Sequence, residues 1–229
     1  WSLLGVELER PVITPLARSY NFTNEVGVFD TIRLLKNING LWLVQECRRV
    51  WREQGSDWSY RELAEMASGA KRLQSFIDPD DGRFEGRCDM PRVIQGYCRE
   101  TGQVVPDEPA QILRLVTDSL AMKVRFVLER LEEVIGDEIE VLHIIGGGGQ
   151  NDQLNKSIAS SINRPVVVGP YEATAAGNVM MQEAALGGFG SLVEGRTMIR
   201  ESFQTRRFEP AHPDEWAAAY GRFRDLLKG

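Results

Sequence analysis

The sequence contains few of the residues on which metal centres and nucleophilic active sites depend. Its 229 residues include only three cysteines and two histidines. Cys47, Cys88 and Cys98 form no C-x-x-C pair, so reduced thiols are expected. His143 and His212 are too few and too far apart to predict a zinc site or a Ser-His-Asp constellation. The chemistry must therefore depend on other groups.

Two further absences limit the partners of the protein. The net charge is -6 and the pI is near 5.2, which favours neither nucleic acid nor an anionic membrane surface as a partner. No apolar run approaches the roughly 20 residues that cross a bilayer, and no basic segment of a signal peptide precedes the first apolar residues. We expect a cytoplasmic protein. Its hydrophobic content of 42% is enough to build a substantial core.

The first part of the chain predicts strands and turns. The chain begins with Trp1 rather than methionine, and Ser2–Leu8 already alternates as a strand would, so covalently earlier residues are expected. The polar composition of 21–27 predicts a turn. A second strand is predicted over 31–36, with Asn37 at its end.

Helical periodicity and capping signals predict most of the helices. Apolar residues recur with helical spacing over 41–53, and a Ser and a Glu at capping-box spacing begin a helix over 59–69. The longest apolar stripe follows Pro106 and ends at Gly136, and we interpret it as core packing. Further helices are predicted over 90–100, 152–162 and 172–186, and from about 213 onward.

The segment 77–82 contains two neighbouring carboxylates, Asp80 and Asp81. They could be imagined as a metal site or as a catalytic pair. Asp and Gly beside Pro are, however, the ordinary composition of a surface turn, which is the interpretation we favour.

The pattern changes to strand, glycine loop, helix and strand between residues 139 and 168. The segment 139–145 is apolar and β-rich, four glycines follow at 146–149, and a second buried strand is predicted over 165–168. With the helix 152–162 between them, the two strands should be parallel neighbours in one sheet. The sequence thus predicts a βαβ unit.

Four consecutive glycines lose much backbone entropy on ordering, so a compensating role is expected. After a strand and before a helix, they let backbone N–H groups approach an anionic ligand, and the helix dipole assists. The loop is not a P-loop, because no Gly-Lys-Ser/Thr follows, and Asn151 replaces the third glycine of the dinucleotide fingerprint. The pattern predicts nucleotide binding, with a purely structural loop as the alternative.

Several segments resemble the FGGY carbohydrate kinases. In the C-terminal part they are IIGGGGQN at 144–151, RPVV at 164–167 and GPYEATAAGN at 169–178. Within the family, the chain most resembles the members that phosphorylate L-rhamnulose. The segments that carry this resemblance are WSLLG at 1–5, NFTNE at 21–25, RLLKNI at 33–38, GLWLVQE at 40–46 and SLA at 119–121. The matches are spread over nearly the whole chain.

The resemblance implies an α/β fold, with an actin-like ATPase, ribonuclease H-like domain that has a mixed sheet and helices on both faces. It implies that 1–229 is the C-terminal, nucleotide-binding FGGY domain, and that an N-terminal sugar-binding and catalytic domain is absent from this chain. The expected reaction transfers the γ-phosphate of ATP, with Mg²⁺, to the 1-hydroxyl of L-rhamnulose. Because the catalytic base belongs to the N-terminal domain, we expect no catalytic residue here and almost no activity of this chain alone.

The resemblance also implies roles for individual residues. Asn37 is expected on the sugar-facing side of the cleft, or else as a turn or helix-entry residue. Gln45 could instead be an exposed helix residue. The expected nucleotide contacts are Gln45, Gly146, Gly147, Gly148, Gln150 and Asn151.

Two alternative functions stay open. Another sugar of the same family, such as L-fuculose or xylulose, could be the substrate, because most sugar contacts lie in the N-terminal domain. A non-catalytic nucleotide-dependent sensor or assembly module is the alternative from a different class.

Overall fold

The computed structural model describes residues 2–228; Trp1 and Gly229, which bound the predicted domain, lie outside the described residues. The strands are β1 (Ser2–Leu8), β2 (Thr23–Val26), β3 (Ile32–Ile38), β4 (Leu142–Ile144), β5 (Val166–Val168) and β6 (Arg206–Phe208). The α-helices are α1 (Pro15–Ser19), α2 (Trp42–Glu53), α3 (Tyr60–Gly69), α4 (Met90–Glu100), α5 (Pro109–Ile135), α6 (Asp152–Ile162), α7 (Ala173–Ala185), α8 (Leu192–Ser202) and α9 (Pro213–Leu226). Short 3-10 helices are η1 (Val28–Asp30), η2 (Gly82–Phe84) and η3 (Gly147–Gln150).

The described strands form two sheets of three strands each. In the first, β3 is the central strand and pairs antiparallel with β1 and β2. In the second, β5 pairs parallel with β4 and antiparallel with β6. The second sheet is therefore the mixed one, and the strands are divided between two sheets rather than joined in a single one.

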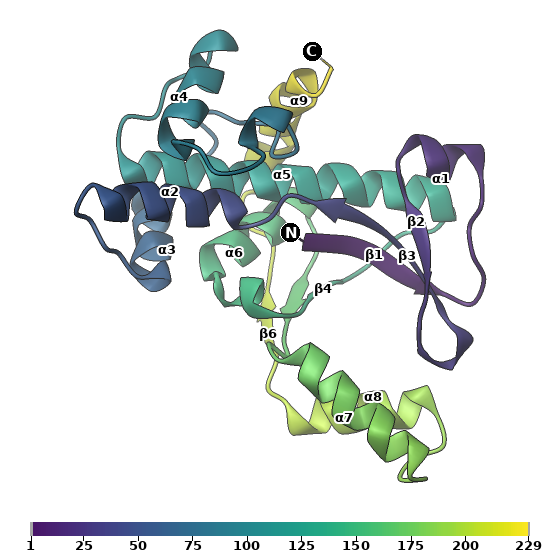
Figure 1. Cartoon of the computed structure of the whole chain (residues 1–229). Helices are drawn as coiled ribbons and strands as arrows, with labels where there is room; N and C mark the ends of the chain where they lie inside the picture. Colours follow the sequence, from purple (N-terminus) through teal and green to yellow (C-terminus); the bar gives the residue numbers. More distant parts are fainter. Residues whose placement is uncertain (1, 229) are drawn as a thin grey trace.

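The helix α5 organises the core. It runs across the molecule, with α2, α3 and α4 at one end and the β1–β3–β2 sheet at the other (Figure 1). Pro109 in its first turn and a capping box of Glu108 and Gln111 favour its start, and Gly136 ends it in the left-handed conformation with φ 71°. Its side chains enter all three hydrophobic clusters, with Leu113, Met122 and Leu131 as examples.

The predicted βαβ unit is confirmed. Val166 and Val168 of β5 are buried and pack under α6, and Leu142 to Ile144 pair in parallel register with them. α6 begins where the Asn151 side chain accepts the Leu154 N–H at 3.0 Å. The glycine loop consequently lies between the end of β4 and the start of α6.

The predicted helices over 41–53, 59–69, 90–100 and 152–162 are present with ends within a residue or two. The turn predicted over 21–27 is wrong, because β2 occupies most of it as an exposed edge strand. The strand predicted over 139–145 is shorter, since only β4 pairs. β3 runs through Asn37 instead of ending before it.

The helix predicted from about residue 213 is present as α9, whereas the sequence pattern predicts no element between residues 187 and 212, where the structure has α8 and β6. Figure 1 shows α7 and α8 lying side by side and projecting away from the other elements. α7 has no buried residue and α8 buries only Gly195, which lies against Met180 and Phe189. An ion pair of 2.7 Å between Arg196 and Glu7 links this helix pair to β1.

The turn predicted over 77–82 is present, and ion pairs and hydrogen bonds hold it in place. Asp78 and Asp80 accept Lys123 of α5 at 2.7 and 3.0 Å, and the Asp80 carboxylate also accepts the Asn39 N–H at 2.8 Å. Asn39 Nδ2 donates to the Pro79 carbonyl at 2.9 Å. These contacts tie the turn to the end of β3.

Among the described residues, no helix combines the length and the apolar character needed to span a membrane.

Candidate functional site

The glycine loop lines a large cleft. The cleft has a volume of about 1790 Å³ and is bounded by β1, the start of α2, the end of β4, the start of α6 and the start of α7. A methyl group added to Gly148 would lie 3.9 Å from Leu41, the residue that precedes α2. The loop therefore lies next to the residue that leads into α2, and both line the same cleft.

Backbone donors of the loop are free to bind a ligand. Gly146 adopts φ 84°, a conformation that favours glycine, and its N–H reaches the Pro170 carbonyl at 3.4 Å. Gly149 and Asn151 donate back into the loop. The N–H groups of Gly147 and Gly148 have no acceptor within the part of the chain that the structure describes. Together with the N-terminus of α6, they form a cradle suited to an anion.

The base of the loop is packed and hydrogen-bonded. A Cβ on Gly149 would lie 2.7 Å from Val168 Cγ1, so glycine is required there by space. The buried Asn155 Nδ2 donates to the Gly149 carbonyl at 2.7 Å. Asn155 Oδ1 is buried and has no hydrogen-bond partner among the described residues. The sequence pattern did not identify Asn155, because its position under the loop depends on the fold of α6.

An ion pair stands beside the N-terminus of α6. The Arg206 guanidinium of β6 binds the Asp152 carboxylate at 2.6 and 2.9 Å, and it donates to the Tyr171 hydroxyl at 3.1 Å. All three residues line the cleft. The carboxylate bonded to Arg206 raises the pKa of that guanidinium, which stays charged. Sequence reasoning missed Arg206, because β6 lies more than 50 residues after Asp152.

Comparison with known proteins decides the family. The model of the FGGY family of carbohydrate kinases, C-terminal domain, matches residues 1–186. The chain belongs to this family.

Curated proteins similar to this chain include rhamnulokinases. That of Bacteroides thetaiotaomicron is 45% identical over 228 residues, which are 100% of this chain and 46% of the relative. That of Bacillus subtilis is 40% identical over 214 residues, or 93% of this chain and 44% of the relative. The chain thus spans less than half the length of these relatives.

Solved structures show the same fold at low sequence identity. A ligand-bound xylulose kinase from Lactobacillus acidophilus matches with a TM-score of 0.67 and 14% identity, over 99% of this chain and 44% of that chain. A glycerol kinase from Plasmodium falciparum with ADP matches with a TM-score of 0.67 and 13% identity, over 99% of this chain and 44% of that chain. The expected actin-like α/β fold is confirmed.

The structure brings the predicted nucleotide residues of this FGGY domain together. All six of these residues line one cleft: Gln45, Gly146, Gly147, Gly148, Gln150 and Asn151. Gln45 lies exposed on α2 and Gln150 lies exposed in η3. Whether they contact a nucleotide stays a prediction.

Asn37 differs from the other predicted residues. It is exposed on β3 and is absent from the residues that line the cleft. Its partner in the antiparallel register is Leu3 of β1, which does line the cleft. Asn37 therefore lies beside the cleft, on the strand that leads to α2.

The described residues contain no group of three or more His, Cys, Asp or Glu side chains arranged to hold a metal ion.

Proposed function

We propose that this chain is the C-terminal, nucleotide-binding domain of a cytoplasmic ATP-dependent kinase that phosphorylates L-rhamnulose at its 1-hydroxyl. The observation that carries the proposal is the pair of unpartnered N–H groups of Gly147 and Gly148 in the wall of the cleft. Membership of the FGGY family and the likeness to rhamnulokinases support the choice of reaction and sugar.

The cleft fits a nucleotide in its chemistry. The Gly147 and Gly148 N–H groups and the α6 N-terminus would bind phosphate oxygens, and Gln150 and Asn151 offer side-chain amides beside them. Gln45 of α2, which lines the same cleft, would also bind the nucleotide. Mg²⁺ would arrive with ATP and neutralise phosphate charge, and we assign it no ligand on this chain.

Phosphoryl transfer depends almost entirely on positioning and on charge stabilisation. This domain would hold the donor and keep its phosphates aligned. An N-terminal domain would supply the aspartate that accepts the proton of the sugar hydroxyl, and it would contribute most of the sugar contacts. Asn37, beside the cleft, would meet the sugar as the two domains close.

Isothermal titration calorimetry of the 229-residue chain with ATP and with ADP tests the nucleotide part of the proposal. We expect both nucleotides to bind, because the cradle is on this chain. No heat of binding with either nucleotide to the folded chain would contradict it. Assays of the sugar require the N-terminal domain and are described in the Discussion.

A further inference from the structure

A second cavity, away from the glycine loop, has a basic wall. Its volume is about 540 Å³, and it lies between the end of α3, the segment after it, α5 and α9. Its charged lining residues are Lys71, Arg72, Arg114, Arg222 and Glu215. Four cations and one carboxylate give a local excess of positive charge on a chain whose net charge is -6.

Arg114 of α5 is the most informative of these cations. The residue is only 7% exposed, and its Nε donates to both carboxylate oxygens of Asp118 at 2.9 and 3.0 Å. Its two η nitrogens have no acceptor among residues 2–228. Four N–H donors of an almost fully buried guanidinium are thus unused in the wall of the cavity. A charged donor in such a position binds an anion more strongly than one on an open surface.

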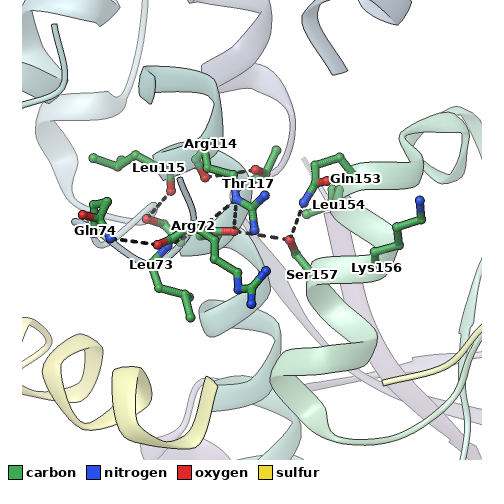
Figure 2. Close-up of polar contacts among 12 residues, drawn as sticks. Arg72, Leu73, Gln74, Arg114, Leu115, Thr117, Gln153, Leu154, Lys156 and Ser157 are labelled. Atoms are coloured by element: carbon green, nitrogen blue, oxygen red, sulfur yellow. Dashed lines mark hydrogen bonds and ion pairs between the residues drawn. The ribbon is translucent and has the colours of Figure 1, made fainter. Parts of the chain in front are cut away.

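The surroundings hold Arg114 in place. Asp118 Oδ2 accepts the Leu73 N–H at 2.8 Å, and Ser157 Oγ of α6 donates to Asp118 Oδ1 at 3.3 Å. Figure 2 shows Arg114 between the 72–74 segment and the part of α6 that carries Ser157. Because the guanidinium is already fixed through Nε, an anion would bind its η nitrogens without an ordering cost.

The other cations differ in availability. Arg72 is bonded to Glu215 at 3.0 and 3.1 Å, and Arg222 donates to the Leu73 carbonyl at 2.6 Å. Lys71 is exposed and forms no ion pair within the described residues. Among the described side chains, Arg114 has both η nitrogens unpaired and Lys71 has its whole ammonium group unpaired, so we assign these two cations to the ligand.

We propose that this cavity is a binding site for a phosphate group, separate from the nucleotide cleft. The planar fork of a guanidinium matches two phosphate oxygens, and an ammonium completes the charge balance. The volume of about 540 Å³ admits a phosphomonoester of a small polar molecule as well as free phosphate. The phosphate group is the chemistry that the two ligands share.

The test is a titration of the ¹⁵N-labelled chain, followed by the amide resonances of Leu73 and Gln74, which lie in the cavity wall. Inorganic phosphate and fructose 1-phosphate are the two probes. We expect both resonances to shift with saturation. The site-specific readout matters, because phosphate bound only at the glycine loop would leave these two resonances unmoved.

Single-residue variants distinguish phosphate binding in this cavity from a general effect of removing a positive charge. Lys71→Gln should weaken binding by up to roughly fivefold, and Arg114→Lys, which loses the fork, by roughly 10- to 100-fold. Lys228→Gln is the matched control, since Lys228 is exposed and is paired with Asp225 outside the cavity. Lys71 has no ion-pair partner among the residues that the structure describes, so Lys71→Gln tests binding without disturbing the buried Arg114–Asp118 pair.

Saturable shifts with both probes would identify phosphate itself as sufficient, and shifts with fructose 1-phosphate alone would identify a phosphomonoester site. Either result supports the proposal if Lys71→Gln weakens binding and Lys228→Gln does not. Unmoved Leu73 and Gln74 resonances with both probes, or equal affinities of the Lys71→Gln and Lys228→Gln chains, would overturn it.

Discussion

Neighbouring glycines of the loop serve different purposes. Gly149 is buried, and a side chain there would collide with Val168. Gly147 is exposed, and a Cβ on it would have nothing within 4 Å. Gly149 is therefore needed by the fold, whereas Gly147 is needed only by a ligand that approaches the backbone closely.

Gly149→Ala should consequently affect the stability of the fold, and Gly147→Ala the affinity for ATP. We expect Gly149→Ala to lower the free energy of unfolding by about 1–3 kcal/mol, the usual cost of overpacking. Gly147→Ala should change it by less than about 0.5 kcal/mol and weaken ATP binding by roughly tenfold. Urea denaturation and calorimetry measure the two effects.

Gly221→Ala on α9 is the control for these variants, because the added methyl group there also meets nothing within 4 Å. It should retain full ATP affinity. ATP affinity that is equal in Gly147→Ala and Gly221→Ala would remove Gly147 from the site.

The three thiols should react in an order set by burial. Cys47 and Cys98 are fully buried, and burial raises the pKa of Cys98 to about 11 and that of Cys47 further. Cys88 is only partly buried. We expect a maleimide to label Cys88 in the native chain and the other two only on unfolding, as peptide mass spectrometry would show. Labelling of Cys47 before Cys88 would contradict the complete burial of Cys47 in α2.

At the scale of elements, the start of α3 shows how a local signal fixes a helix. Ser59 and Glu62 form the predicted capping box, with the Glu62 carboxylate accepting the Ser59 N–H at 2.7 Å. This hydrogen bond from the backbone holds the pKa of Glu62 below its ordinary value of 4.5, and the hydrogen bond from the Ser59 hydroxyl contributes a smaller part of the effect. The ionised form is therefore the one that stabilises the fold.

The capping box should make stability depend on pH. Because the pKa of Glu62 is lower in the folded chain than in the unfolded chain, its contribution is fully present above the unfolded pKa and is lost as the pH falls through the folded pKa. We expect Glu62→Gln to be less stable than the parent chain at neutral pH, and the difference to shrink below pH 4.5. Denaturation curves over a pH series measure this. A difference that does not change with pH would exclude the carboxylate as its source.

The helix pair α7 and α8 should be the least protected part of the described chain. Almost none of its side chains are buried, whereas α5 is buried along most of its length. Local opening is cheap where few apolar contacts must be broken. Hydrogen exchange followed by mass spectrometry should show faster exchange in 173–202 than in α5. Equal protection of the two regions would contradict the arrangement in Figure 1.

Elements with strong local signals were predictable from the sequence, and those defined by their neighbours were not. α3 has its capping box and α5 its apolar stripe between Pro109 and Gly136, so both could be placed. β2 is an exposed edge strand of three polar residues and Val26, and only its pairing with β3 makes it a strand. For the same reason the glycine loop could be recognised, but the contacts of Asn155 and Arg206 could not.

For the whole molecule, the central issue is which part of the proposed kinase reaction this chain could perform by itself. The chain covers 46% of the rhamnulokinase of Bacteroides thetaiotaomicron, and the model of the C-terminal FGGY domain matches residues 1–186. One wall of a cleft can hold a nucleotide, but it cannot align a phosphate with a sugar hydroxyl. We therefore expect nucleotide binding from this chain and turnover only with an N-terminal FGGY domain.

The most direct test joins this chain to an N-terminal FGGY domain and measures ADP formation with L-rhamnulose, L-fuculose and D-xylulose. Our account predicts turnover that requires both domains, with the highest kcat/KM for L-rhamnulose. A preference for another ketose would contradict the assigned substrate, and no ADP formation with any of the three sugars by the folded protein would contradict the assignment as a sugar kinase.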